Sequence, residues 1–204
     1  MVHGQVNPAV FLDRDGVLNR NVYYSESGEW EAPRSVADFE VIPGAMDAVA
    51  ALQRAGYQLF LVSNQPNMAK GKAQQADHEG IHRRLLSLFE SAGVKLQEAY
   101  YCFHHPKGSV AALSGPCICR KPSPYFLRRA QKDYDLDMSH SWMIGDRDTD
   151  IECGQQAGVR TIQISEQERR ELPRNPDYVA PSIVEAAGVI LRNADESIGE
   201  APVE

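Results

Sequence analysis

Short apolar runs alternate along the chain with segments that repeat apolar residues at helical spacing. The apolar runs have the length of buried strands and lie at residues 9–12, 57–63, 97–101, 142–145 and 160–164. The helical segments lie at residues 45–52, 81–89, 125–134, 151–157 and 182–193. Strands that alternate with helices predict an α/β fold, in which helices cover both faces of a doubly wound, mainly parallel sheet.

Two of the predicted helices carry start signals. Ser123 has the side chain of an N-cap, and Pro124 suits the first helical position, so a helix is expected to begin there. Ser182 and Glu185 have the spacing of a capping box, which predicts a last helix that ends near Asn193.

The composition favours one compact domain. With 204 residues and 43% hydrophobic content, the chain can bury one core, expected over residues 1–194 and followed by a disordered acidic tail at 195–204. The formal net charge of -7 disfavours nucleic acid as a partner. No apolar run reaches the roughly 18 residues of a membrane span, and residues 1–7 lack a signal sequence. We therefore expect a monomeric cytoplasmic protein that acts on a small molecule.

Polar residues follow three of the predicted strands at their carboxyl ends. Asp13 follows the first strand, Ser63 ends the second, and Asp146 follows the run that ends at Gly145. Ligands of open parallel sheets bind outside the carboxyl ends of the strands. The sequence therefore predicts that these three residues converge on one crevice.

Four acidic residues near that edge indicate a cation site. Asp13 and Asp15 are separated by one residue and followed by Gly16, which allows a sharp turn. Carboxylates this close repel one another unless a cation offsets their charge. Together with Asp146 and Asp150, they form a set suited to a hard, oxygen-preferring ion such as magnesium. Taken alone, the Asp-x-Asp-Gly sequence is equally compatible with a solvated turn.

Four segments together resemble the signatures of the haloacid dehalogenase superfamily of phosphotransferases. They are residues 11–17, residues 63–65, Lys121 before a proline, and residues 145–150, and they occur in that order. The resemblance implies a Rossmann-like core. The intervals between the first three signatures are short, so no large cap domain is expected.

The resemblance also implies roles for the signature residues. Asp13 would attack phosphorus to give an aspartyl phosphate, and Asp15 would serve as general acid and then as base. Magnesium would be held by the carboxylates of Asp13 and Asp146 and the carbonyl of Asp15, while Asp150 orients the site. The residues expected to contact the phosphoryl oxygens are Ser63 and Lys121.

A cysteine-rich loop indicates a second metal. Cys102, His104, Cys117 and Cys119 offer three thiolates and an imidazole, which is the ligand set of a closed, structural zinc site. The neighbouring His105 is the competing ligand. A zinc ion without a vacant coordination position would stabilise the loop and take no part in the chemistry.

The zinc loop, residues 102–119, narrows the resemblance. Residues 100–106 and 117–122 resemble the zinc loop of the D,D-heptose 1,7-bisphosphate phosphatases, and the related histidinol-phosphate phosphatases carry a similar loop. The resemblance implies hydrolysis of the 7-phosphate of D-glycero-D-manno-heptose 1,7-bisphosphate. Histidinol phosphate is the alternative substrate. A zinc-stabilised binding module with a vestigial site is the non-enzymatic alternative.

The same resemblance implies substrate contacts outside the signatures. Arg120 would grip a second, non-reacting phosphate through its forked donors. The other residues expected to bind substrate are Asn21, Val22, Tyr23, Tyr24, Asn64, Gln65 and Arg147. Asparagine and tyrosine are also common in solvated loops, so a surface role for them stays open. The chain departs from the family at Pro66 and Asn67, where serine and glycine are usual.

Overall fold

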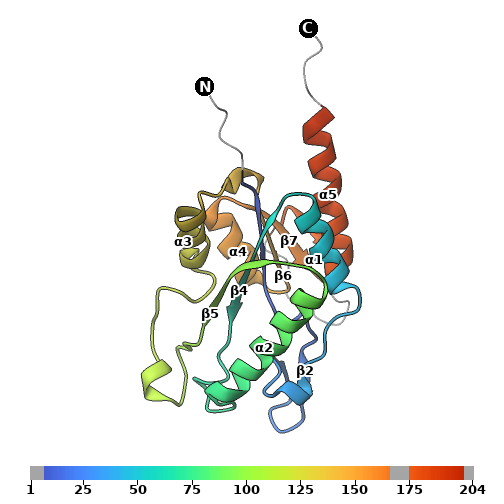
Figure 1. The fold of residues 1–204 in the computed structure, drawn as a ribbon. Helices are drawn as coiled ribbons and strands as arrows, with labels where there is room; N and C mark the ends of the chain where they lie inside the picture. Colours follow the sequence, from blue (N-terminus) through green and yellow to red (C-terminus); the bar gives the residue numbers. More distant parts are fainter. Residues whose placement is uncertain (1–6, 166–174, 200–204) are drawn as a thin grey trace.

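A computed structural model describes residues 7–165 and 175–199, and a parallel sheet of six strands lies at its centre (Figure 1). The strands are β1 (Ala9–Leu12), β4 (Gln58–Asn64), β5 (Leu96–Cys102), β6 (Trp142–Gly145), β7 (Arg160–Ile164) and β8 (Tyr178–Ala180). Their order across the sheet is β5-β4-β1-β6-β7-β8. The strand order reverses direction between β1 and β6, which is where doubly wound sheets bind their ligands. The predicted fold class is confirmed.

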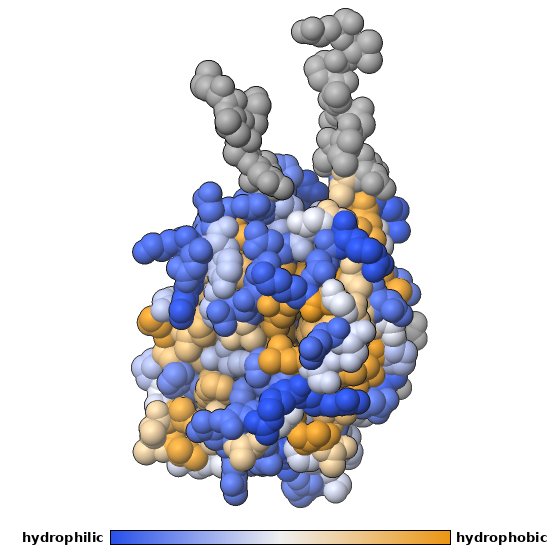
Figure 2. Space-filling model, in the orientation of Figure 1, coloured by the Kyte–Doolittle hydropathy of each residue, from blue (hydrophilic) through white to orange (hydrophobic). Residues whose placement is uncertain are grey.

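Helices cover both faces of this sheet (Figure 1). One face carries α1 (Ala45–Arg54), α2 (Gln75–Ser91) and α5 (Ile183–Gly199), and the other carries α3 (Tyr125–Tyr134) and α4 (Asp148–Ala157). Short 3-10 helices lie at η1 (Val36–Asp38), η2 (Ala111–Leu113) and η3 (Met138–His140). No helix in the described parts of the chain combines the length and apolarity that a bilayer span needs. The face drawn in Figure 2 is mainly hydrophilic.

The central strand β1 shows why the sheet is sandwiched between helices. Val10 and Leu12 pack in the core beneath α1 and α5, whereas Ala9 and Phe11 pack in the core beneath α3 and α4. All four side chains are fully buried. Because successive side chains of a strand point to opposite faces, an uninterrupted apolar run requires cover on both sides.

The predicted helix ends are partly corrected. Ser123 does not cap α3, because its hydroxyl donates to the carbonyl of Ile118 at 2.6 Å and Pro124 occupies the cap position. Ser182 does cap α5, since its hydroxyl accepts from the amide of Val184 at 3.1 Å. Helix α5 then runs to Gly199, so the first part of the expected tail is helical. Residues 200–204 lie outside the described residues.

A hairpin that the sequence analysis did not anticipate lies at the carboxyl end of the sheet. It consists of β2 (Val22–Tyr24) and β3 (Glu29–Glu31), whose cross-strand pair Tyr23 and Trp30 has ring centroids 5.6 Å apart. The hairpin and η1 precede α1, and the interval from 63 to 121, which is also fully described, holds α2, β5 and η2. Neither interval holds a separate cap domain, as expected.

The packing of α5 on α1 gives a stability prediction. Ile190 is fully buried in the shared core, so Ile190→Ala should lower the free energy of unfolding by about 3 kcal/mol through lost burial and the cavity left behind. Val184 lies on the same helix with 44% of its surface exposed, and Val184→Ala should cost less than about 1 kcal/mol. Urea unfolding measures both, and equal losses would contradict this packing.

Candidate active site

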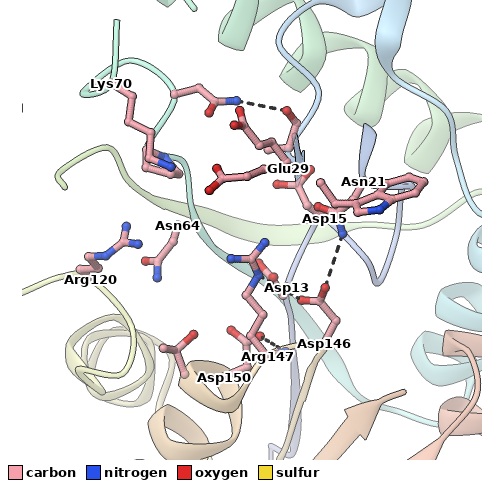
Figure 3. A pocket seen from close by; sticks show the side chains of 16 residues that line it. Asp13, Asp15, Asn21, Glu29, Asn64, Lys70, Arg120, Asp146, Arg147 and Asp150 are labelled. Carbon is pink, nitrogen blue, oxygen red and sulfur yellow. Dashed lines mark hydrogen bonds and ion pairs between the residues drawn. The ribbon is translucent and has the colours of Figure 1, made fainter. Parts of the chain in front are cut away.

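A cavity of about 570 Å³ opens at the carboxyl edge of the sheet (Figure 3). Eight of the residues proposed from the sequence line it, namely Asp13, Asp15, Asn21, Asn64, Arg120, Asp146, Arg147 and Asp150. They come from loops far apart in the chain, which the parallel strands bring to one edge. Asp13 and Asp146 therefore converge on the cavity as expected, whereas Ser63 does not line it.

Lys121 is buried next to this cavity and joins two of the carboxylates that line it. Its Nζ is 2.9 Å from Asp13 Oδ1 and 2.7 Å from Asp150 Oδ1, and it donates to the carbonyl of Val62 at 2.6 Å. Burial alone would lower the pKa of Lys121, but the two carboxylates outweigh burial and raise that pKa above its ordinary value. The lysine is therefore a fixed positive charge beside Asp13.

Three carboxylates lie close together at this edge of the sheet. Asp13, Asp146 and Asp150 each offer an oxygen, and these oxygens all lie within 4.8 Å of one another. Burial raises the pKa of Asp150 to about 6, although Lys121 opposes the shift. A cluster of hard oxygen ligands with excess negative charge fits a magnesium ion. The carboxylate of Asp15 does not belong to this cluster.

The turn that carries the cluster requires glycine at position 16. Gly16 has a φ of 84°, and a Cβ built on it would lie 2.3 Å from Asp146 Oδ2. A side chain there would displace the carboxylate as well as strain the backbone. The Nδ2 atom of Asn21 approaches the same Oδ2 atom at 3.4 Å (Figure 3).

Asn64 and Arg120 anchor the segment that carries Lys121. The Asn64 side chain donates to the carbonyl of Lys121 and accepts from its amide, both at 3.1 Å. Arg120 donates from Nη1 to the carbonyl of His104 at 3.1 Å, and its side chain lines the cavity. The end of β4 and the zinc loop therefore fix Lys121 together.

The four expected zinc ligands meet in the loop. The Sγ atoms of Cys102, Cys117 and Cys119 are 3.3–3.8 Å apart, and His104 Nδ1 lies 3.7 and 3.8 Å from two of them. Zinc bonded to thiolates at about 2.3 Å would place neighbouring sulfurs about 3.8 Å apart, so the set fits this ion. His105 instead accepts from the amide of Lys107.

Not all expected substrate contacts line the cavity. Ser63 and Gln65 are buried behind its wall, and Val22, Tyr23 and Tyr24 belong to strand β2 of the hairpin. The Tyr24 hydroxyl donates to Asp38 and accepts from the amide of Arg34, whose guanidinium lies 3.7 Å from the ring centroid. Tyr24 therefore holds the hairpin in place.

The hairpin and the loop after β4 contribute cavity residues that sequence reasoning missed. They are Glu29, Trp30, Glu31, Ala32, Pro66, Asn67 and Lys70. Asn67 Nδ2 donates to the carbonyl of Ala32 at 3.1 Å, and Lys72 forms an ion pair with Glu31. The aromatic residues Tyr23, Tyr24 and Trp30, with Gly28 between the two strands, were the available signal for the hairpin.

The doubly wound sheet and the lysine-bridged carboxylates at its switch point define a hydrolase of the haloacid dehalogenase type. A family model described as HAD-hydrolase-like matches residues 118–186. D-glycero-beta-D-manno-heptose-1,7-bisphosphate 7-phosphatase of Salmonella typhi is 33% identical over 188 residues, which are 91% of this chain and 96% of the relative. The protein of that name from Vibrio cholerae is 38% identical over 76% of this chain and 78% of the relative. The chain belongs to this family of heptose-1,7-bisphosphate 7-phosphatases.

Solved structures agree with this assignment. The D,D-heptose 1,7-bisphosphate phosphatase of B. bronchiseptica, solved with magnesium and phosphate, superposes with a TM-score of 0.74 at 25% identity. The match covers 91% of this chain and 99% of that one. A HAD-like phosphatase from Mesorhizobium loti superposes with a TM-score of 0.76 at 26% identity, over 99% and 94% of the two chains.

The buried lysine gives a second stability prediction. Lys121→Met should lower the free energy of unfolding by about 3 kcal/mol without divalent cations, because it leaves buried carboxylates without their counter-charge. Adding Asp150→Asn should restore at least about 1 kcal/mol, since it removes one of those charges. Urea unfolding of both single variants and the double variant measures the coupling. Strictly additive losses would contradict it.

Proposed function

We propose that this chain hydrolyses the 7-phosphate of D-glycero-D-manno-heptose 1,7-bisphosphate through an aspartyl-phosphate intermediate. The observation that carries the proposal is the buried Lys121 bridging Asp13 and Asp150 in a cavity at the switch point of the sheet. Phosphoryl transfer needs a nucleophile beside fixed positive charge, and this arrangement provides both. The names of the relatives support the choice of sugar.

In the first step an Asp13 oxygen attacks phosphorus, and the bond from phosphorus to the sugar oxygen breaks. Asp15 donates a proton to that leaving oxygen, which departs as the alcohol. In the second step a water molecule gives a proton to Asp15 and attacks the phosphorus of the aspartyl phosphate. Inorganic phosphate leaves, and the Asp13 carboxylate is restored. Lys121 and the hydroxyl of Ser63 stabilise the phosphoryl oxygens in both steps.

Magnesium fits the carboxylate cluster that the structure presents. Asp13, Asp146 and the carbonyl of Asp15 would hold the ion, which neutralises charge on the phosphoryl group when bound. Asp150 is tied to Lys121 at 2.7 Å and accepts from the amide of Arg147 at 3.0 Å. Its role in the proposal is to orient the lysine rather than to ligate the ion.

In the proposal, a zinc ion stabilises the loop beside the cavity. Cys102, His104, Cys117 and Cys119 would hold the ion, and the loop would present Arg120 to the cavity. The Arg120 guanidinium is suited to bind the phosphate that does not react. Asn21, Asn64 and Arg147 line the cavity and remain proposed substrate contacts.

The same proposal covers the setting of the protein. Residues 1–194 form one phosphatase domain that acts as a monomer on a small phosphorylated sugar. The four cysteines form no disulfide, which suits the reducing environment of the cytoplasm.

The nucleophile is tested by Asp13→Asn, which should lower kcat by at least about a thousandfold because no aspartyl phosphate can form. Phosphate release is measured with heptose 1,7-bisphosphate and with histidinol phosphate. The wild type should prefer the heptose by kcat/KM. A preference for histidinol phosphate would overturn the proposed substrate, and activity of Asp13→Asn above a few per cent would overturn the nucleophile.

The zinc proposal is tested by metal content and stability. The purified wild type should carry about one equivalent of zinc, and Cys119→Ser should lose it together with thermal stability. Cys153 is buried outside the cluster, so Cys153→Ala is the matched control and should keep the metal. Mass spectrometry of the metals and thermal unfolding give the readouts. A wild type that is purified without zinc, and whose Tm equals that of Cys119→Ser, would contradict the proposal.

A further inference from the structure

Three buried side chains surround the carboxylate of Asp15. Arg14 donates from Nε and Nη2 to Asp15 Oδ1 at 3.1 and 3.0 Å, and Nη2 also reaches Oδ2 at 3.1 Å. Asn19 Nδ2 donates to Oδ1 at 2.9 Å, and Gln65 Nε2 donates to Oδ2 at 2.6 Å. Both oxygens of Asp15 are therefore fixed in direction by donors that do not line the cavity.

Gln65 connects these contacts to the proposed phosphate site. Its Oε1 accepts from Arg14 Nη2 at 2.8 Å, while its Nε2 donates to Asp15 and also to Ser63 Oγ at 3.0 Å. A flipped amide would place oxygen against the carboxylate and nitrogen against the guanidinium, so only one orientation is favourable. Because the Ser63 oxygen accepts from Gln65, its own proton is directed to another acceptor. One amide thus orients both Asp15 and Ser63.

The burial of Arg14 ties its positive charge to the carboxylate of Asp15. Its side chain is 0% exposed, and among residues 7–165 and 175–199 its ion pair is with Asp15. A buried guanidinium is costly unless it is paired and hydrogen-bonded. Tyr101, His78 and His82 lie near Arg14. Burial, and to a smaller extent the charge of Arg14, lowers the pKa of His82 and lowers the pKa of His78 to about 4. Those imidazoles are neutral, which leaves Asp15 as the counter-charge of Arg14.

We propose that Arg14, Asn19 and Gln65 are positioning residues that aim the Asp15 carboxyl group at the leaving oxygen. The inference rests on the proposed function, in which Asp15 is the general acid. Loss of a positioning residue slows proton delivery. Loss of Gln65 also frees Ser63, which adds a loss that does not depend on the leaving group. Alcohols and weakly acidic phenols need that proton to depart, whereas para-nitrophenolate departs without it. The variants should therefore be selectively impaired with poor leaving groups.

The test compares Gln65→Leu and Asn19→Ala with the wild type on para-nitrophenyl, phenyl and ethyl phosphate, which share no sugar contacts. The ratio kcat/KM reports the steps up to departure of the leaving group, because that departure is irreversible when initial rates are measured without added product. With para-nitrophenyl phosphate kcat/KM of Asn19→Ala should fall less than about threefold, and with phenyl and ethyl phosphate about 30-fold or more. Gln65→Leu should show the same difference between the compounds, added to a uniform loss from the freed Ser63. An equal loss on all three compounds, or none, would overturn the inference.

Two further variants separate the possible failures. Ser141→Ala removes buried hydrogen bonds to Ala9 and Asp137 at the opposite end of the sheet, so it should cost stability and leave kcat/KM unchanged. Asp15→Asn should show the steepest dependence on the leaving group. If it does and the Gln65 and Asn19 variants do not, the positioning inference fails alone. If Asp15→Asn shows none, the proposed role of Asp15 fails as well.

Discussion

The ammonium group of Lys121 is the interaction on which the site depends. It contacts Asp13 after β1, Asp150 in α4 and the carbonyl of Val62 in β4. Without it, the buried carboxylates of Asp13 and Asp150 would repel one another at the edge of the sheet. The ammonium group in turn depends on the zinc loop and on Asn64, which hold the backbone of Lys121 from two directions. The zinc loop and Asn64 thus fix the position of the Lys121 ammonium group at the edge of the sheet.

The hydrophobic pattern was sufficient to predict the central strands of the sheet, but it did not predict the edge strand β8, and the sequence wrongly predicted a helix cap at Ser123. Strands β6 and β7 begin and end where the apolar runs predicted, because both faces of these strands are covered. Strand β8 was not predicted, since it has three residues and two of them are exposed at the sheet edge. Ser123 was wrongly predicted as a cap because the carbonyl of Ile118, brought near by the zinc loop, binds its hydroxyl. Such competition between partners depends on the fold and is not visible in local sequence.

The residues of the site also divide into those that the sequence could place and those that it could not. Asp13, Ser63 and Asp146 could be placed from sequence because strand ends fix their positions. The cluster of Cys102, His104, Cys117 and Cys119 could be placed because the spacing and chemistry of these residues restrict the alternatives. Trp30 and Lys70 could not, because they reach the cavity only through the folding of a hairpin and a loop. Arg14 stood inside a signature, yet only the structure shows that its charge is turned inward to Asp15.

The link between Asn67 and Ala32 has a consequence for protein engineering. The side-chain amide of Asn67 ties the exit of the hairpin to the loop after β4. Lys72 and Glu31 reinforce the same connection. This hairpin, placed in a relative without an asparagine at that position, would lose its partner side chain on the other loop. Exchange of the two loops as a single cassette is therefore the sound way to recombine specificity within this family.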